Sequence, residues 1–380
     1  MILSEEEKML QTTVRNFAEQ ELSPNALEAD TTEEFWHESF KKMASLGLTG
    51  ITIDPKFGGS GGGYRQSSIA IEEIARGDAS SSVNLIAHLS LSTATINTFG
   101  NDEQKDKYLR NLASGNSIGA WALTEPGGGS DAANINTTAI KDGDNYLLNG
   151  SKTFITNADV ADYIVVYATL NKSDNYKNIT AFIVESTSPG ITITSLKGKL
   201  GMRSSTASEI VFNNTPVPIG NRLGEEGSGF KNAMTILDSS RISIASQCVG
   251  IGQGALDAAV KYSQTRETFG KPIIQHQAIQ FMIADMATAV HSARVTTMDA
   301  ATLKDTGLDF SSEASIAKLL ASEMCIDVTS KALQIHGGYG YFKEAHVERM
   351  FRDARVTTIY EGTSEIQRLV VARQTLQNYK

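Results

Sequence analysis

The hydrophobic periodicity of the chain changes twice, and this change limits the folds that it can adopt. Up to about residue 115 the apolar residues recur with helical spacing, and from about 116 to 227 short alternating or β-branched runs predict strands. Long helical segments return from residue 229 onward. Because helices do not alternate with the strands, no βαβ series is expected. The sequence therefore predicts a mainly α-helical protein with an antiparallel β domain, divided as 1–115, 116–227 and 228–380.

The individual elements follow this division. Ser4 and Glu7 have the spacing of a capping box, so the first helix is expected to begin there and to end before Pro24. Further helices are expected at 34–45, 66–76, 82–98, 102–113, 230–263, 276–305, 312–335 and 362–378. Strands are expected at Ile118–Leu123, Tyr146–Leu148, Tyr163–Ala168, Ile179–Val184, Ile191–Thr194 and Glu209–Phe212.

Composition and charge exclude several classes of protein. The chain of 380 residues is 41% hydrophobic and carries a formal net charge of −9, which argues against binding to nucleic acid or to an anionic membrane. Cys248 and Cys325 lie far apart in the sequence and neither has a neighbouring ligand residue, as expected for a protein of a reducing compartment. The N-terminus lacks the features of a signal peptide, and no apolar run approaches the ~18 residues of a membrane span. A soluble, cytoplasmic protein is expected.

Some motifs resemble catalytic signatures but lack the required context. Residues 250–255 fit the dinucleotide pattern G-x-G-x-x-A, yet they lie inside a continuous helical pattern and are better explained by close helix packing. The pattern G-x-S-x-G occurs at 58–62 and 115–119 without a strand before it and a helix after it, so both are interpreted as turns. The six histidines form no ligand cluster. Neither a metal site nor a serine hydrolase is predicted.

Three other stretches combine glycine with reactive or polar residues. Residues 121–131 place a strand end against a glycine-rich loop, which is either a hairpin connection or a loop that a planar ring or a phosphate can approach closely. Residues 152–157 form a second strand end that carries a hydroxyl. In 359–368, Glu361 precedes a glycine and two hydroxyl residues at the start of the last helix. Glu361 is either a catalytic carboxylate or an acidic residue favoured by the helix dipole.

Together these stretches resemble the acyl-CoA dehydrogenase family over nearly the whole chain. The motifs that carry the resemblance are, in order, Thr124–Asp131, Ile155–Asn157, Lys199–Ser205, Arg266–Ile273, Gln334–Tyr341 and Tyr360–Arg368. The resemblance implies an N-terminal helical domain, a middle β-barrel-like domain and a C-terminal four-helix bundle, assembled as a homotetramer. It also implies FAD as cofactor and acyl-CoA as substrate.

The resemblance assigns roles to individual positions. Those expected around the flavin ring are Leu123, Thr124, Ser130, Phe154 and Thr156. Those expected at the remainder of FAD are Arg266, Thr268, Phe269, Thr363 and Glu365, with Gln334, Gly337 and Gly338 supplied by a neighbouring subunit. Those expected at the substrate are Ser130, Asp238, Arg241 and Gly362. Phe154 departs from the tryptophan common in the family and lacks its indole N–H donor.

Glu361 is the catalytic base that the resemblance implies. Desaturation beside a thioester removes an α-proton and a β-hydride, and a carboxylate with a raised pKa is the stronger base for the proton. Some branched-chain members carry the base near residue 240, but Ser240 cannot fill that role and Glu361 is present. The expected reaction converts a short-chain acyl-CoA, linear or branched, to trans-2-enoyl-CoA, with electrons passed to an electron-transfer flavoprotein.

Alternatives remain for the reaction and for the acyl chain. A flavin-dependent acyl-CoA oxidase is one, although such oxidases are usually longer, and a non-catalytic scaffold or DNA-associated protein of the same fold is another. Leu85 and Ile86 either shorten the acyl pocket or pack against the neighbouring bundle. The match of Thr235–Ser246 and Glu361–Arg368 to short-chain members favours four- to six-carbon substrates.

Overall fold

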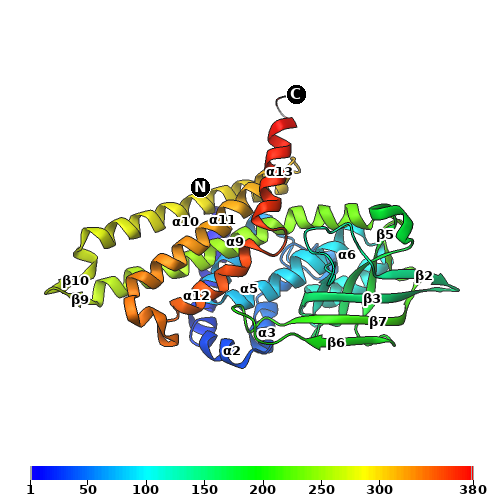
Figure 1. Cartoon of the computed structure of the whole chain (residues 1–380), viewed down its shortest axis with the longest axis horizontal. Coiled ribbons are helices and arrows are strands. Elements are labelled where there is room, and N and C mark those ends of the chain that lie inside the picture. The colour runs from blue at the N-terminus through cyan, green and yellow to red at the C-terminus, as the bar shows by residue number, and fades with distance from the viewer. Residues whose placement is uncertain (1, 378, 380) are drawn as a thin grey trace.

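The computed structural model of the chain, which describes residues 2–377 and residue 379, has helices at both ends of the sequence and a sheet between them (Figure 1). The first helix, α1 (Glu5–Phe17), begins as predicted. The backbone N–H of Ser4 donates to the Glu7 carboxylate at 2.9 Å, and the Glu7 N–H donates to the Ser4 hydroxyl at 3.1 Å. These bonds satisfy backbone donors that the first turn leaves free.

The remaining N-terminal elements largely match the predicted helices. They are η1 (Ala18–Leu22), α2 (Ala26–Thr32), α3 (His37–Ser45), η2 (Leu48–Gly50), η3 (Pro55–Phe57), α4 (Tyr64–Gly77), α5 (Ala79–Ile86), η4 (Ala87–Thr93), α6 (Ala94–Phe99), α7 (Asp102–Gln104), η5 (Lys105–Leu109) and α8 (Arg110–Ala113). Helix α2 was not predicted. The segment α5–η4–α6 is continuous and contains a π-helical stretch, and its residues from Ala79 to Ile96 are buried.

The middle of the chain forms one mixed sheet. Its strands are β1 (Gly119–Ala122), β2 (Thr138–Asp142), β3 (Asn145–Thr156), β4 (Tyr163–Thr169), β5 (Ile179–Glu185), β6 (Ile191–Ser195), β7 (Ala207–Pro218) and β8 (Arg222–Leu223). They follow the order β6-β7-β3-β2-β4-β5-β8, with β1 beside β4. Strand β2 was not predicted, because it is short and its last residues are exposed.

The predicted antiparallel β region also contains two parallel strand pairs. Strand β1 pairs with β4 in parallel, with Gly119 opposite Tyr163, and β2 also meets β4 in parallel at Thr138 and Thr169. After β1 the chain passes through the glycine-rich loop and the β2–β3 hairpin before it returns as β4. The residue pattern within a strand does not indicate whether the strand pairs in parallel or antiparallel with its neighbour.

The C-terminal part is a bundle of long helices. Its elements are α9 (Gly229–Thr265), the hairpin β9 (Glu267–Thr268) and β10 (Lys271–Pro272), η8 (Ile273–Gln275), α10 (Gln277–Asp305), α11 (Ser311–His336), η9 (Gly337–Tyr341), η10 (Lys343–Ala345), α12 (Val347–Ala354), η11 (Arg355–Thr358) and α13 (Ser364–Gln377). Figure 1 shows α9, α10 and α11 running lengthwise together, while α13 projects away from them.

The glycines of the dinucleotide-like pattern serve helix packing, as predicted. A Cβ at Gly250 would lie 2.2 Å from the carbonyl oxygen of Glu72, and one at Gly254 would lie 2.7 Å from that of Arg76. Both carbonyls belong to α4, and a Cβ at Gly252 would lie 2.9 Å from the sulfur of Met324 on α11. Only residues without a side chain allow α9 to approach its neighbours this closely.

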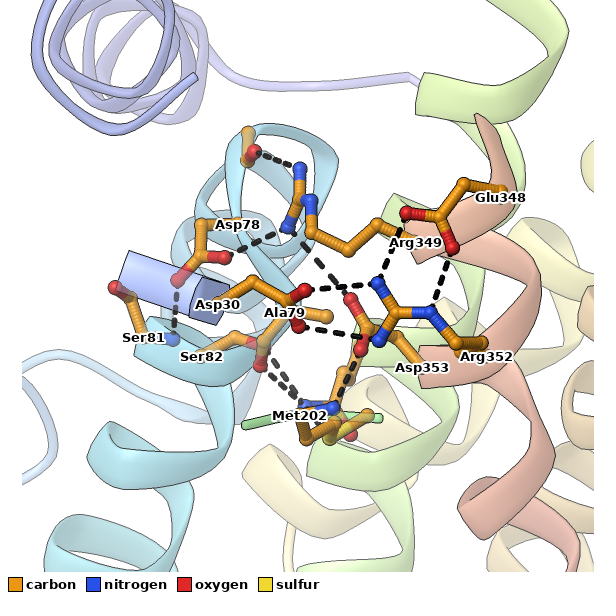
Figure 2. A network of polar contacts seen from close by, with 12 residues as sticks. Asp30, Asp78, Ala79, Ser81, Ser82, Met202, Glu348, Arg349, Arg352 and Asp353 are labelled. Atoms are coloured by element: carbon orange, nitrogen blue, oxygen red, sulfur yellow. Dashed lines mark hydrogen bonds and ion pairs between the residues drawn. The ribbon is translucent and has the colours of Figure 1, made fainter. Parts of the chain in front are cut away.

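A buried polar network joins α12 to the N-terminal helices and to the loop before β7 (Figure 2). Arg349 donates to Asp78 at 2.8 Å and lies 3.6 Å from Asp353, which accepts the backbone N–H of Met202 at 2.5 Å. Burial raises the pKa of Asp353 to about 6. Since η11 and Glu361 follow α12 directly, this network fixes the segment that leads into the predicted catalytic residue.

Candidate active site

Glu361 lies on a turn between η11 and α13, not within the helix itself. Its φ of +50° and that of Gly362, +92°, are both in the left-handed region. The Glu361 carboxylate accepts a hydrogen bond from the hydroxyl of Ser240 on α9, whereas the acidic residue in the first turn of α13 is Glu365. The alternative interpretation of Glu361, as a carboxylate that stabilises the helix N-terminus, therefore does not describe its contacts.

Burial governs the acidity of Glu361. It raises the pKa of the carboxyl to about 7, against the opposing effects of the Ser240 hydroxyl and of the positive charges on Lys318 and Arg241. A carboxylate with this pKa is ionised in part at neutral pH and holds a proton more firmly than an exposed one does. The site therefore contains a base suited to removing a weakly acidic proton.

Two buried side chains hold the backbone of this turn. The Lys318 ammonium donates to the carbonyl of Gly362 at 2.7 Å, and the Gln367 amide donates to the carbonyls of Glu361 and Gly362 at 3.3 and 3.1 Å. The φ of +92° at Gly362 favours glycine, and a Cβ there would lie 2.5 Å from the Gln367 amide nitrogen and displace that side chain from its hydrogen bonds.

Tyr360, the residue before Glu361, is anchored on the other side of the turn. Its hydroxyl donates to the amide oxygen of Gln247, which is fully buried on α9. The Gln247 amide nitrogen donates to the Ser82 hydroxyl at 2.8 Å and to the Ala79 carbonyl at 3.1 Å. The turn is thus fixed to α9 and α5 as well as to α11.

The predicted substrate residues on α9 lie beside Glu361. Asp238 accepts a hydrogen bond from Arg241 at 2.5 Å and another from Ser311 at 3.1 Å. Arg241 also donates to Ser315 at 3.1 Å, while its Nε has no protein partner among the described residues. Burial raises the pKa of Asp238, although the charge of Arg241 opposes this. Two consecutive residues of α9, Ser240 and Arg241, therefore bring a hydroxyl and a guanidinium close to the turn.

The predicted flavin-ring residues gather at the ends of β1 and β3. The Thr153 N–H donates to the Thr124 carbonyl at 3.0 Å, so the two strand ends lie side by side. Lys152, fully buried, donates to the Leu123 carbonyl at 3.0 Å and to Glu125 at 2.8 Å. Phe154, which sits at a register shift between β3 and β7, has a φ of +59° and is 70% exposed.

Ser130 and Thr156 belong to the same region but differ in setting. Ser130 is exposed on the glycine-rich loop, and Thr156 is half-buried at the last position of β3. Thr363 and Glu365 lie at the start of α13, where the Thr363 hydroxyl accepts the Ile366 N–H at 3.3 Å. Hydrogen bonds from its own backbone and from Thr363 lower the pKa of Glu365.

The remaining predicted cofactor residues lie elsewhere in the subunit. Arg266, Thr268 and Phe269 are at the β9–β10 hairpin, which Figure 1 shows at the opposite end of the molecule from the sheet. Phe269 is 96% exposed, and the Arg266 guanidinium lies 5.5 Å from the ring of Tyr339. Gln334, Gly337 and Gly338 are exposed near this hairpin, at the end of α11 and in η9. A single chain therefore does not bring the two groups of cofactor residues together.

Sequence reasoning missed the buried residues that support the turn. These are Lys318, Gln247 and Gln367, of which Gln247 acts through the half-buried Tyr360. A signal existed for Lys318, which lies at helical spacing with the buried residues Ala314 and Ala321, on a face where lysine is unexpected. Lys318 and Gln367 bind backbone carbonyls, and the sequence does not show which side chains will bind them.

Within residues 2–377 and 379, no group of three or more histidine, cysteine or acidic side chains is arranged to hold a metal ion. No helix among these residues is long and apolar enough to span a membrane.

Comparison with known proteins defines the class. The family models for the N-terminal, middle and C-terminal domains of acyl-CoA dehydrogenase match residues 4–116, 120–215 and 227–376. The chain belongs to the acyl-CoA dehydrogenase family.

Individual relatives and solved structures show which members of the family the chain is similar to. The chain is 48% identical over 378 residues to the mitochondrial short-chain specific acyl-CoA dehydrogenase of Bos taurus, covering 100% of this chain and 92% of that protein. The structure of butyryl-CoA dehydrogenase from Megasphaera elsdenii superimposes with a TM-score of 0.97 at 42% identity, covering 99% of both chains. A chain solved in work on the electron transferring flavoprotein of Acidaminococcus fermentans gives the same TM-score at 43% identity, also covering 99% of both chains.

Proposed function

We propose that the protein catalyses FAD-dependent α,β-dehydrogenation of a short-chain acyl-CoA to the trans-2-enoyl-CoA and passes the electrons to an electron-transfer flavoprotein. The observation that carries the proposal is Glu361, a carboxylate whose pKa burial raises to about 7, held on a strained turn at the family's last motif. The names of the relatives support the substrate class and the electron acceptor.

The residues present fit a flavin. Gly127 and Gly129 have open space where a Cβ would stand, so a ligand can approach the main chain of the loop closely. Phe154 presents an exposed aromatic face at the neighbouring strand end, as a planar ring system would require. Leu123, Thr124, Ser130, Phe154 and Thr156 would hold the ring, and when bound FAD would accept the β-hydride.

Glu361 would take the α-proton on its carboxylate. The Ser240 hydroxyl would orient that group, and the backbone N–H of Glu361 would donate to the thioester carbonyl, where negative charge develops. Ser130, Asp238, Arg241 and Gly362 are proposed to contact the substrate. The tight hold on the turn by its neighbours keeps both the base and the N–H donor in fixed orientation.

Assembly as a homotetramer would unite the two groups of cofactor residues. The proposal assigns Arg266, Thr268 and Phe269 to one subunit and Gln334, Gly337 and Gly338 to its neighbour at the same FAD. The exposed side chains Phe269 and Tyr339, together with Leu369 and Leu376 on the projecting α13, support such contacts between subunits. A flavin-saturated monomer in light scattering would contradict this assembly.

The preference for four to six carbons rests mainly on the relatives. Leu85 and Ile86 are fully buried in the largest core cluster, together with residues of α9 and α11. This burial agrees with the alternative that they pack against the neighbouring bundle. Each methylene that a shorter pocket excludes would forfeit about 0.8 kcal/mol of burial. Specificity constants across acyl-CoA lengths should peak at short chains, and a peak at long chains would overturn the preference without affecting the reaction type.

A spectroscopic experiment tests the reaction itself. Pure protein should be yellow, and anaerobic butyryl-CoA should bleach the flavin absorption. Fast aerobic release of hydrogen peroxide would favour an oxidase instead, and colourless protein that cannot be loaded with FAD would favour a scaffold role.

A further inference from the structure

Lys318 is a buried cation whose role the proposed chemistry leaves open. It lies in the middle of α11, is fully buried, and donates to the neutral carbonyl of Gly362 at 2.7 Å. Within the described residues it forms no ion pair with a carboxylate. Burying an ammonium group without a close counter-ion costs several kcal/mol, so its presence calls for a reason.

The charged and titratable groups that act on Lys318 come from three neighbouring segments. Glu361 and Glu365 approach from the turn and α13, and Arg241 and Cys248 approach from α9. Burial lowers the pKa of Lys318 to about 8, and the negative groups around it oppose that effect. The ammonium is therefore charged at neutral pH, directly behind the turn that carries the base.

Arg241, the other cation near Glu361, differs from Lys318 because it has a carboxylate partner. Arg241 is paired with Asp238 at 2.5 Å, so much of its charge is compensated locally. Lys318 has no carboxylate at ion-pair distance within the described residues, and its positive charge lowers the pKa of Glu361. Of the two positive groups, Lys318 is thus the one whose removal changes the electrostatics of the base without disrupting an existing ion pair.

The backbone of the turn also needs a restraint. The left-handed conformation of a residue with a side chain, as at Glu361, costs about 1–2 kcal/mol and persists only when the surroundings hold it. Lys318 donates a hydrogen bond to the carbonyl of Gly362, and Gln367 donates one to the carbonyl of Glu361. The hydrogen bond and the charge of Lys318 therefore act on the same short segment.

We propose that Lys318 is a positioning residue for proton abstraction, which holds the Glu361–Gly362 turn through the Gly362 carbonyl and favours the ionised form of the Glu361 carboxylate. This inference rests on the proposed role of Glu361 as the base. A purely structural role, in which Lys318 only fixes α13 against α11, would affect stability but not the pH dependence of the reaction.

The first test is the pH profile of flavin reduction. Rapid mixing of the FAD-loaded enzyme with butyryl-CoA should show that Lys318→Met moves the acidic limb of the rate to higher pH by about one unit, because loss of a positive charge makes Glu361 easier to protonate. Lys318→Arg should restore most of the wild-type profile. Lys331→Met is the matched control, since Lys331 is on the same helix but pairs with Asp327 at 2.8 Å near the surface. If Lys318→Met does not fold, Lys318→Gln replaces it with the same expected shift.

The second test does not depend on turnover. A double-mutant cycle of Lys318→Met with Glu361→Gln, measured by the unfolding midpoint of the FAD-loaded protein, should show coupling at about pH 7.5 that disappears near pH 5, where Glu361 is protonated. An unshifted acidic limb, or coupling that does not change with pH, would overturn the role of Lys318. Near-normal flavin reduction in Glu361→Gln alone would instead refute the proposed base, so the two failures are distinguishable.

Discussion

Replacement of the proposed base should affect catalysis and stability in opposite directions. In the wild type the pKa of Glu361 is about 7, compared with a usual value of 4.5. The rate of flavin reduction should therefore fall as the pH drops below about 7, by about tenfold for each further unit. Glu361→Gln has no group to accept the proton, so its rate should be lower by a factor on the order of 10²–10⁴ and should lack this limb.

The same shift in pKa gives the expected change in stability. A rise from 4.5 to about 7 corresponds to about 3 kcal/mol, at 1.36 kcal/mol per unit. Because the folded state binds the proton more tightly than the unfolded state, the wild type gains stability as the pH falls from about 7 to 4.5. Above that window it bears the full cost of burying the charge. Glu361→Gln should therefore be more stable than the wild type at high pH, by up to about 3 kcal/mol, and the difference should vanish near pH 4.5.

Both effects can be measured on one pair of variants. Anaerobic rapid mixing with butyryl-CoA gives the rate, and urea unfolding of the FAD-loaded protein across pH gives the stability. Glu323→Gln serves as the control, because this half-exposed carboxylate on α11 pairs with Arg368 away from the turn. Near-normal reduction in Glu361→Gln, an acidic limb in the wild type near 4.5, or a loss of stability in the variant at high pH would each refute the reasoning.

Three further substitutions test other parts of the structure. Ser240→Ala removes a hydrogen bond that lowers the pKa of the base, so the acidic limb of flavin reduction should move to higher pH, and an unmoved limb would contradict the contact. Gly250→Ala forces a Cβ to within 2.2 Å of a carbonyl of α4 and should cost about 1–3 kcal/mol in urea unfolding, whereas Gly220→Ala, with open space around it, should cost little. Lys152→Met leaves Glu125 buried without its partner and should cost about 3–5 kcal/mol while lowering FAD content; full stability and full flavin content would show that the strand ends do not depend on this pair.

The elements that sequence reasoning predicted well are those with local signals. The capping box of α1, the long periodic helices α9, α10 and α11, and the helical context of Gly250 depend on residues close in sequence. Helices α2 and α12 were missed because they are short, with seven and eight residues, and carry few buried apolar residues. The parallel pairing of β1 with β4 was missed because it depends on the path of the intervening chain.

The site was predictable to the extent that its residues belong to motifs. Glu361, Asp238 and Arg241 were named from the sequence, and the structure brings them together. What holds them was not predictable, because Lys318 and Gln367 act on backbone carbonyls and Gln247 acts through Tyr360 from 113 residues away. Such contacts require the fold to be known first.

The length of α9 has a consequence for how this chain can vary. Its 37 residues extend over about 55 Å, from Gly229 against the backbone of β5, past Ser240, to the hairpin at Arg266. Insertion of one residue into this helix would rotate everything beyond it by about 100° and advance it by about 1.5 Å. An insertion between Ser240 and Gly250 would turn the glycine stripe away from α4 while the hydroxyl beside the base stayed in place. Insertions and deletions should therefore be tolerated in surface loops such as 142–145 but not in α9. The length of α9 sets the distance and the rotation between the two ends of the subunit.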